Sequence, residues 1–193
     1  MIQMADIALP LEDKLYTYKD YKEWELAEGE RYELIDGRAY AMASPTDYHQ
    51  AISMELSRQF ANFLVGKPCK VRAAPYDVRL YYEEDESDDT VVQPDITIIC
   101  DESKRGTEGC RGAPTLVVEI TSPSNTVKEM TRKFDLYYNA GVQEYWVVYA
   151  ETKELHVHHF ENGHIVTNIY HEHDKAPVGV LPGLQIDLEQ VFA

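Results

Sequence analysis

Two runs of strand-forming residues separated by one helical pattern constrain the fold of this chain more than any other feature. The runs PTLVVEIT at 114–121 and QEYWVVYA at 143–150 are rich in β-branched and aromatic residues. Between them, VKEMTRKFDLYYNAG follows a capping-box pattern made by Thr126 and Glu129 and ends at Gly141. Because a helix between two strands lets the chain return in the same direction, this order allows a parallel crossover.

Two glycine-containing turns predict antiparallel hairpins on either side of this unit. Asp36-Gly37 divides RYELIDGRAYAMA into two alternating halves, and Asn162-Gly163 joins KELHVHHF to HIVTNIYH. These dipeptides favour the two-residue turn that usually connects antiparallel strands. A sheet that contains both the hairpins and the crossover must be mixed.

Two further helices and two further strands complete the expected order. Residues 16–28 place aromatic residues at helical spacing, with Thr17 as N-cap and Gly29 as stop, and residues 46–65 carry apolar residues at every fourth position. These two expected strands cover residues 69–82, bent at Pro75, and 94–100.

This order predicts an α/β or α+β fold, with a mixed central β-sheet flanked by helices, an N-terminal helix and hairpin, and a C-terminal hairpin. We expect a single domain over residues 1–193, because no linker or repeat interrupts the pattern. Residues 1–15 are expected to be poorly ordered or extended.

Cysteine and charge content restrict the compartment and the partners. The three cysteines, Cys69, Cys100 and Cys110, include no CxxC pair, so their spacing predicts neither a disulfide framework nor a zinc site. With no secretory signal and no apolar segment of membrane-spanning length, we expect a soluble, cytoplasmic protein. The net charge of −16 argues against a general nucleic-acid binder. Part of that charge lies in EEDESDD at 83–89, which is expected to be a solvated loop.

Two acidic residues lie at the ends of neighbouring expected strands. Asp95 opens PDITII and Glu119 lies in LVVEI, where a buried carboxylate must be paired, protonated or bound to a metal. If the two strands present the same face, the carboxylates converge into an oxygen-rich site of the kind that Mg²⁺ or Mn²⁺ prefers. Lys133, on the following helix, is a candidate for a cation that orients an attacking water.

Each of these residues also has an ordinary structural explanation. An aspartate such as Asp95 often caps a turn, and Glu119 is explained as well by a salt bridge to a basic neighbour. Lys133 alone is typical of a solvated helix residue, and its neighbour Arg132 competes for the same role. The histidines of HVHH and HEH provide no clear third and fourth zinc ligand.

Taken in order, several motifs resemble the Uma-two family of proposed restriction endonucleases, a branch of the PD-(D/E)XK nuclease superfamily. They are RYELIDG, HQ, PDI, VVEITSPS and the lysine of TRKFDLYYNAGVQEYW. The resemblance implies that Asp95 and Glu119 bind a divalent metal. The usual superfamily lysine would lie two residues after the glutamate, where this chain has Thr121, and Lys133 fits a lysine that has moved onto the next helix.

Three further residues match the family pattern and are expected around the site: Glu33, His49 and Asp77. Glu33 is a candidate for an additional metal ligand. His49 lies in the first turns of its expected helix, where an exposed polar residue is ordinary. Asp77 shares a strand face with Arg79, so a surface ion pair between them is the simpler explanation of that residue.

The resemblance implies a Mg²⁺-dependent endonuclease that hydrolyses phosphodiester bonds in DNA, often as a homodimer. The alternative is a catalytically inactive nuclease-fold module that binds a protein or nucleic-acid partner, which Thr121 and the net charge favour. A two-carboxylate glycosidase fits less well, because the aromatic residues are better explained as core. For DNA binding we expect a basic rim made of Lys67, Lys70, Arg72, Lys104, Arg105 and Arg111.

Overall fold

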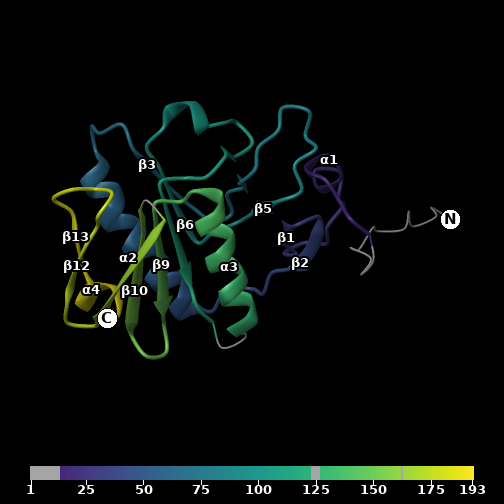
Figure 1. Ribbon diagram of the computed structural model, residues 1–193. Coiled ribbons are helices and arrows are strands. Elements are labelled where there is room, and N and C mark those ends of the chain that lie inside the picture. Colours follow the sequence, from purple (N-terminus) through teal and green to yellow (C-terminus); the bar gives the residue numbers. More distant parts are fainter. Residues whose placement is uncertain (1–13, 123–126, 162) are drawn as a thin grey trace.

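The computed structural model describes residues 14–122, 127–161 and 163–193 (Figure 1). Nearly all of the segment expected to be poorly ordered or extended, residues 1–15, lies outside the described residues. So do Thr126 of the expected capping box and Asn162 of the second expected turn. Among the helices of the described residues, none is long and apolar enough to cross a membrane.

A six-stranded mixed sheet forms the centre of the fold, as predicted. Its strand order is β11-β10-β9-β8-β6-β3, with β8 and β9 parallel and the other neighbours antiparallel. The parallel pair is the one that the strand-helix-strand pattern predicted. The strands are β3 (Lys70–Ala73), β6 (Ile96–Ile99), β8 (Leu116–Ile120), β9 (Glu144–Tyr149), β10 (Glu154–Glu161) and β11 (His164–His171).

One helix covers each face of this sheet (Figure 1). Helix α2 (Asp47–Leu64) begins after Thr46, whose hydroxyl accepts the N–H of His49. Its apolar side, made of the four residues at every fourth position, is buried as the spacing predicted. Helix α3 (Val127–Ala140) connects β8 to β9 and packs on the opposite face through Leu136 and Tyr137.

The structure also has a second sheet, which the sequence did not predict. It lies on the same side of the central sheet as α3. Its order is β2-β1-β5-β4-β7, and it shares a core with α3 through Ile35, Val78 and Val92. The β1–β2 hairpin has the predicted tight turn, with φ of 50° at Asp36 and 73° at Gly37. The strands are β1 (Tyr32–Ile35), β2 (Arg38–Ala41), β4 (Val78–Arg79), β5 (Val91–Val92) and β7 (Cys110–Arg111).

The C-terminal segment adds short elements that have too few residues for a periodic pattern. A two-stranded sheet and a helix turn pack against the α2 side of the core through Ala176, Ile186 and Leu188. A 3₁₀ turn, η1 (Glu102–Lys104), lies in the connector before β7. The C-terminal elements are β12 (Lys175–Pro177), β13 (Gln185–Asp187) and α4 (Leu188–Val191).

Two expected elements differ from the structure. The expected helix over 16–28 is reduced to α1 (Tyr18–Tyr21), although Thr17 caps it as predicted. The centroid of the Trp24 ring instead lies 5.2 Å from that of Tyr16 and 6.0 Å from that of Tyr32. Tertiary aromatic contacts therefore replace the later turns of the expected helix. The expected strand 69–82 divides into β3 and β4, which belong to different sheets.

The expectation of no disulfide is also wrong, because Cys69 and Cys100 are bonded to each other. Lys70 pairs with Ile99 in the antiparallel β3–β6 ladder, which places the two cysteines opposite each other just beyond it. The separation of 31 residues is set by strand pairing, and no short-range cysteine motif reveals it. Cys110 is free and buried.

The acidic segment 83–89 is not wholly solvated. Asp88 is buried and accepts hydrogen bonds from the Arg79 guanidinium, whose Nε lies 2.9 Å from Oδ2. The same guanidinium lies between the rings of Tyr18 and Tyr82, at 3.9 and 4.4 Å from their centroids. The predicted surface pair of Asp77 with Arg79 is therefore wrong, since Arg79 belongs to a buried pair with the loop.

Candidate active site

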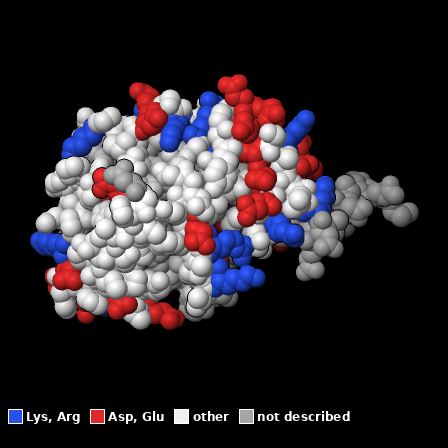
Figure 2. Space-filling model, viewed as in Figure 1, with Lys and Arg blue, Asp and Glu red and all other residues white. Residues whose placement is uncertain are grey.

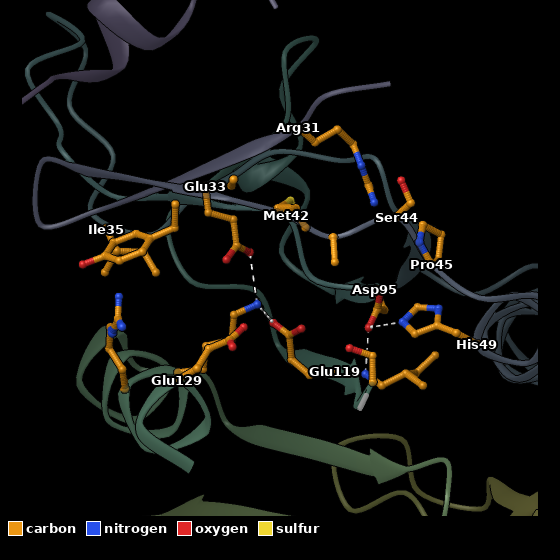
Figure 3. A pocket seen from close by; sticks show the side chains of 17 residues that line it. Arg31, Glu33, Ile35, Met42, Ser44, Pro45, His49, Asp95, Glu119 and Glu129 are labelled. Atoms are coloured by element: carbon orange, nitrogen blue, oxygen red, sulfur yellow. Dashed lines mark hydrogen bonds and ion pairs between the residues drawn. The ribbon is translucent and has the colours of Figure 1, made fainter. Parts of the chain in front are cut away.

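The chain crosses between the two sheets at residues 93–95, directly after β5 and before β6, and a pocket opens there. The pocket has a volume of about 380 Å³. Its walls come from β1, β2 and the segment after β2 on one side, and from β8, α2 and α3 on the other (Figure 3). Five predicted site residues line it: Glu33, His49, Asp95, Glu119 and Lys133.

The two predicted metal-binding carboxylates lie side by side in this pocket. Ile96 pairs with Val118 in the antiparallel β6–β8 ladder, so Asp95 and Glu119 occupy the adjacent positions on one face of the sheet. The Oδ2 atom of Asp95 accepts the backbone N–H of Ile120 at 2.7 Å. This bond ties the residue before β6 to the end of β8 and fixes the spacing of the two carboxylates.

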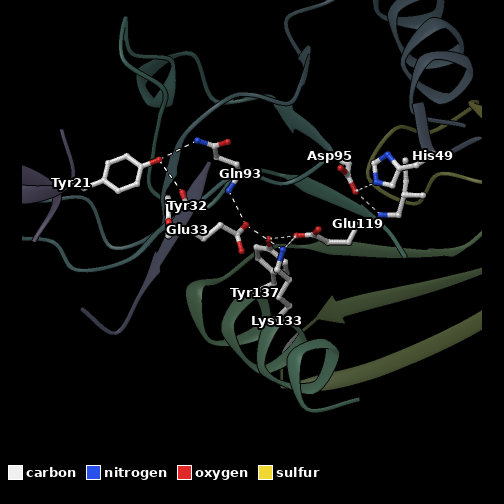
Figure 4. A network of polar contacts seen from close by, with 10 residues as sticks. Tyr21, Tyr32, Glu33, His49, Gln93, Asp95, Glu119, Lys133 and Tyr137 are labelled. Atoms are coloured by element: carbon white, nitrogen blue, oxygen red, sulfur yellow. Dashed lines mark hydrogen bonds and ion pairs between the residues drawn. The ribbon is translucent and has the colours of Figure 1, made fainter. Parts of the chain in front are cut away.

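Lys133 reaches Glu119 from the second turn of α3 (Figure 4). Its ammonium donates to Glu119 Oε1 at 2.9 Å and to Glu33 Oε1 at 3.2 Å. The Tyr137 hydroxyl, one turn further along, donates to the same oxygen of Glu119 at 2.6 Å. Arg132, the competing cation in the sequence, instead lies over the Tyr40 ring.

The cluster carries more negative charge than Lys133 neutralises. Burial raises the pKa of Glu119 to about 7, and the negative charges of Glu33 and Asp95 add to this effect, together outweighing the attraction of Lys133. Burial disfavours the charged form of Lys133, but Glu119 and Glu33 outweigh burial and raise its pKa. Lys133 is therefore a permanent cation at neutral pH.

His49 lies beside the other carboxylate. Its Nε2 is 3.3 Å from Asp95 Oδ2, and its Nδ1 is buried without a hydrogen-bond partner among the described residues. Burial lowers the pKa of His49, but the hydrogen bond to Asp95 and the charges of Asp95 and Glu119 outweigh it and raise the pKa overall. The charge of Asp95 therefore stabilises the protonated form of His49.

A chain of polar contacts extends from Glu33 away from the pocket (Figure 4). The backbone N–H of Gln93 donates to Glu33 Oε1 at 3.0 Å, and its side-chain amide donates to Asp77 Oδ1 at 2.9 Å and to the Tyr21 hydroxyl at 3.1 Å. Asp77, expected around the site, thus lies outside the pocket lining and connects to it through Gln93. Burial raises the pKa of Asp77. Gln93 carries no sequence signal of its own.

The donor set fits a hard divalent cation that keeps part of its water shell. In the described chain, no three His, Cys, Asp or Glu side chains are grouped to hold a metal, and this includes the histidines of β10. Mg²⁺, however, needs only one or two carboxylates and completes its shell with water. Asp95 and Glu119 each use one oxygen for the hydrogen bonds above, and the second oxygen of each accepts none from the described residues.

The basic rim predicted from the sequence does not form part of the pocket. None of the six predicted rim residues lines the pocket; the described basic side chains that do so are Arg31, Arg132 and Lys133. On the face shown in Figure 2, described charges of both signs are mixed around a broad uncharged area. At the pocket, these three cations lie beside four carboxylates, those of Glu33, Asp95, Glu119 and Glu129.

Comparison with known proteins agrees with this architecture. The chain is 30% identical over 142 residues to the uncharacterized protein slr1290 of Synechocystis sp., covering 73% of this chain and 72% of that protein. Its fold matches the crystal structure of "a putative nuclease belonging to DUF820" from Anabaena variabilis, with a TM-score of 0.70 and 18% identity, over 91% of this chain and 97% of that one. The family "Uma2: Putative restriction endonuclease" matches residues 18–189. With nearly its whole described length matched, the chain belongs to the Uma2 family, the one its motifs resemble.

Proposed function

We propose that the protein is a metal-dependent endonuclease that hydrolyses phosphodiester bonds in DNA. One observation carries this proposal: Asp95, directly before β6, and Glu119, on β8, lie in one pocket, each with a carboxylate oxygen that accepts no hydrogen bond from the described residues. Burial and then the negative charges of Glu33 and Asp95 raise the pKa of Glu119, and a divalent cation would neutralise that charge. Membership of the family supports a nuclease rather than another two-carboxylate enzyme.

Asp95 and Glu119 would hold Mg²⁺ or Mn²⁺ through these free oxygens. A metal bound there supplies a water of lowered pKa and neutralises charge on the phosphate. The remaining contacts keep the two carboxylates in place. Ile120 and His49 hold Asp95 Oδ2, while Lys133 and Tyr137 hold Glu119 Oε1.

Lys133 would orient the attacking water or stabilise the phosphate as a cation. An ammonium has three N–H donors, and two of them are used by Glu119 and Glu33. The third can donate to a water or phosphate oxygen in the pocket. Because the pKa of Lys133 is raised, it is protonated at neutral pH and cannot act as a general base.

The main sequence argument for an inactive binding module was the absence of a lysine two residues after Glu119. Thr121 occupies the usual lysine position, but Lys133 brings an ammonium within 2.9 Å of Glu119 from α3. Arg31, Arg132 and Lys133 line the pocket beside its carboxylates, so the net charge of the whole chain does not by itself exclude an anionic ligand there. The experiment below distinguishes a binding module from a nuclease.

Calorimetric titration with Mn²⁺ and plasmid nicking, measured on the same preparations, test the proposal. The variants Asp95→Asn and Glu119→Gln keep the side-chain shape but remove the charge that binds metal. Glu102→Gln is the matched control, because the Glu102 side chain is 92% exposed on η1, away from the pocket.

We expect Mn²⁺ binding and nicking in the wild type and in the control, and loss of both in Asp95→Asn and Glu119→Gln. Circular dichroism should show that all variants are folded. A folded variant of either residue that nicks at the wild-type rate would show that the site is wrongly assigned. A wild type that neither binds Mn²⁺ nor nicks would favour the binding module.

A further inference from the structure

Arg31 lines the pocket that holds Glu33, Asp95 and Glu119, and its side chain pairs with none of the described residues. It lies just before β1, where its carbonyl accepts the N–H of Met42 at 2.8 Å, and its side chain extends into the pocket (Figure 3). No hydrogen bond or ion pair joins its guanidinium to another described residue. Three arginines elsewhere in the described chain pair with a carboxylate: Arg58 with Glu55, Arg79 with Asp88 and Arg105 with Glu102.

Arg132 is a second such cation, on the opposite wall. It projects from α3 and lies 4.2 Å from the centroid of the Tyr40 ring of β2, again with no carboxylate partner among the described residues. Stacking on a ring holds a guanidinium in place and leaves its N–H donors free. The pocket thus has, on the strand wall and on the α3 wall, a guanidinium that pairs with no carboxylate of the described residues.

Arg132 also lines a second hollow, of about 460 Å³, which lies between the β1–β2 turn and the outer side of α3. The two hollows share Ile35 and Arg132, so they adjoin each other at this side chain. Lys128 and the half-exposed ring of Tyr81 line the second one, together with Asp36 and Asp135. A chain-like ligand that passes the carboxylates can therefore continue across Arg132 into further space.

We propose that Arg31 and Arg132 bind the phosphates on either side of the scissile phosphate of a polynucleotide strand. The assignment rests on the proposed function, because it places the scissile phosphate at Asp95 and Glu119. A planar guanidinium with free donors matches phosphate oxygens in a bidentate contact. Three anion sites in one pocket, two of them arginines and one the proposed metal site, fit a ligand with repeating phosphates better than a single phosphate ester.

Both arginines are positioning residues, since they contact neighbouring phosphates rather than the reacting one. Their loss should weaken substrate binding and leave the chemical step nearly unchanged. It should also reduce the salt dependence of binding, because each phosphate contact releases counterions. A purely structural role of Arg132 on Tyr40 would change stability without changing either quantity.

The test uses a short fluorescein-labelled single-stranded oligodeoxynucleotide and the full-length protein. Binding is measured by fluorescence anisotropy with Ca²⁺ in place of the catalytic metal, over a series of salt concentrations. Cleavage kinetics are measured with Mn²⁺. The variants are Arg31→Gln and Arg132→Gln, with Arg31→Lys and Arg132→Lys to restore the charge, and Arg58→Gln as the exposed control paired only within the α2 and α4 surface.

We expect each glutamine variant to raise Kd and KM by about tenfold and to change kcat by less than about twofold. Each should lower the slope of log K against log salt by about 0.7, the value for one phosphate contact on a single strand. The lysine variants should recover most of that slope, and Arg58→Gln should match the wild type.

The inference is overturned if the wild type cleaves while both glutamine variants bind and cleave as the control does. In that case the protein is still a nuclease, but Arg31 and Arg132 do not bind its substrate. If the wild type does not cleave, the binding arm still decides: arginine-dependent, salt-dependent binding upholds the phosphate sites and removes the nuclease assignment. If the wild type does not cleave and neither arginine affects its binding, both the nuclease assignment and the phosphate sites are wrong.

Discussion

Replacing Lys133 by methionine should strongly destabilise the protein, because it removes the one cation shared by two buried carboxylates. The exposed fractions of the Lys133, Glu33 and Glu119 side chains are 8%, 5% and 11%. Leaving buried charges without a partner costs about 3–5 kcal/mol. For a chain of 193 residues this corresponds to a fall in Tm of roughly 10 °C.

The loss of unfolding free energy caused by Lys133→Met should increase with pH. The pKa of Glu119 is raised from 4.5 to about 7, so its contribution to stability is complete below pH 4.5 and is lost as the pH rises through 7. Lys133 is the one cation that lowers this pKa, and its removal should raise the pKa further. The loss of stability in Lys133→Met should therefore be larger at pH 8 than at pH 5.

Urea unfolding of wild type and variants at both pH values measures these differences. Lys128→Met is the matched control on the same helix, and because Lys128 is exposed it should change the free energy of unfolding by less than about 0.5 kcal/mol. Adding Glu33→Gln to Lys133→Met should restore part of the loss, since only one buried carboxylate then remains. A cost under about 1 kcal/mol, or one that is equal at pH 5 and pH 8, would refute the proposed balance of charges.

Two further predictions concern stability away from the site. Burial, with the charges of nearby histidines, lowers the pKa of His158 from 6.5 to about 4, so the unfolded chain binds more protons between these values and stability should fall as the pH drops from 6.5 to 4. Urea unfolding of His158→Gln should show a smaller fall, and an unchanged pH slope would contradict the assignment. At Gly109, with a φ of 140°, a Cβ would lie 2.3 Å from the Asp77 carbonyl oxygen. Gly109→Ala should cost at least about 2 kcal/mol in thermal unfolding, more than Gly66→Ala, where the space is open; equal costs would count against this contact.

The site was predicted from the sequence in part. The family motifs identified Asp95, Glu119 and Lys133 as a group with Glu33 and His49, and the structure brings all five to one pocket. Asp77 matched the same motifs but lies one hydrogen bond beyond the pocket, behind Gln93. Arg31 and Gln93 were missed, because a single arginine or glutamine without a motif looks like any surface residue.

Local features of the fold followed from the sequence by itself. The Asp36-Gly37 turn, the buried side of α2 and the parallel crossover through α3 depend on backbone preference and on periodicity. Backbone preference and periodicity act between residues a few positions apart, so these local features can be predicted from the sequence alone.

Other features were decided only by the tertiary structure. The Cys69–Cys100 disulfide joins residues 31 positions apart, and the contact of Lys133 with Glu33 spans 100 positions. The division of residues 69–82 between two sheets and the burial of Asp88 against Arg79 are of the same kind. Each depends on which strands pair and where the chain crosses from one sheet to the other, and that choice is made by packing the whole core rather than by any local segment.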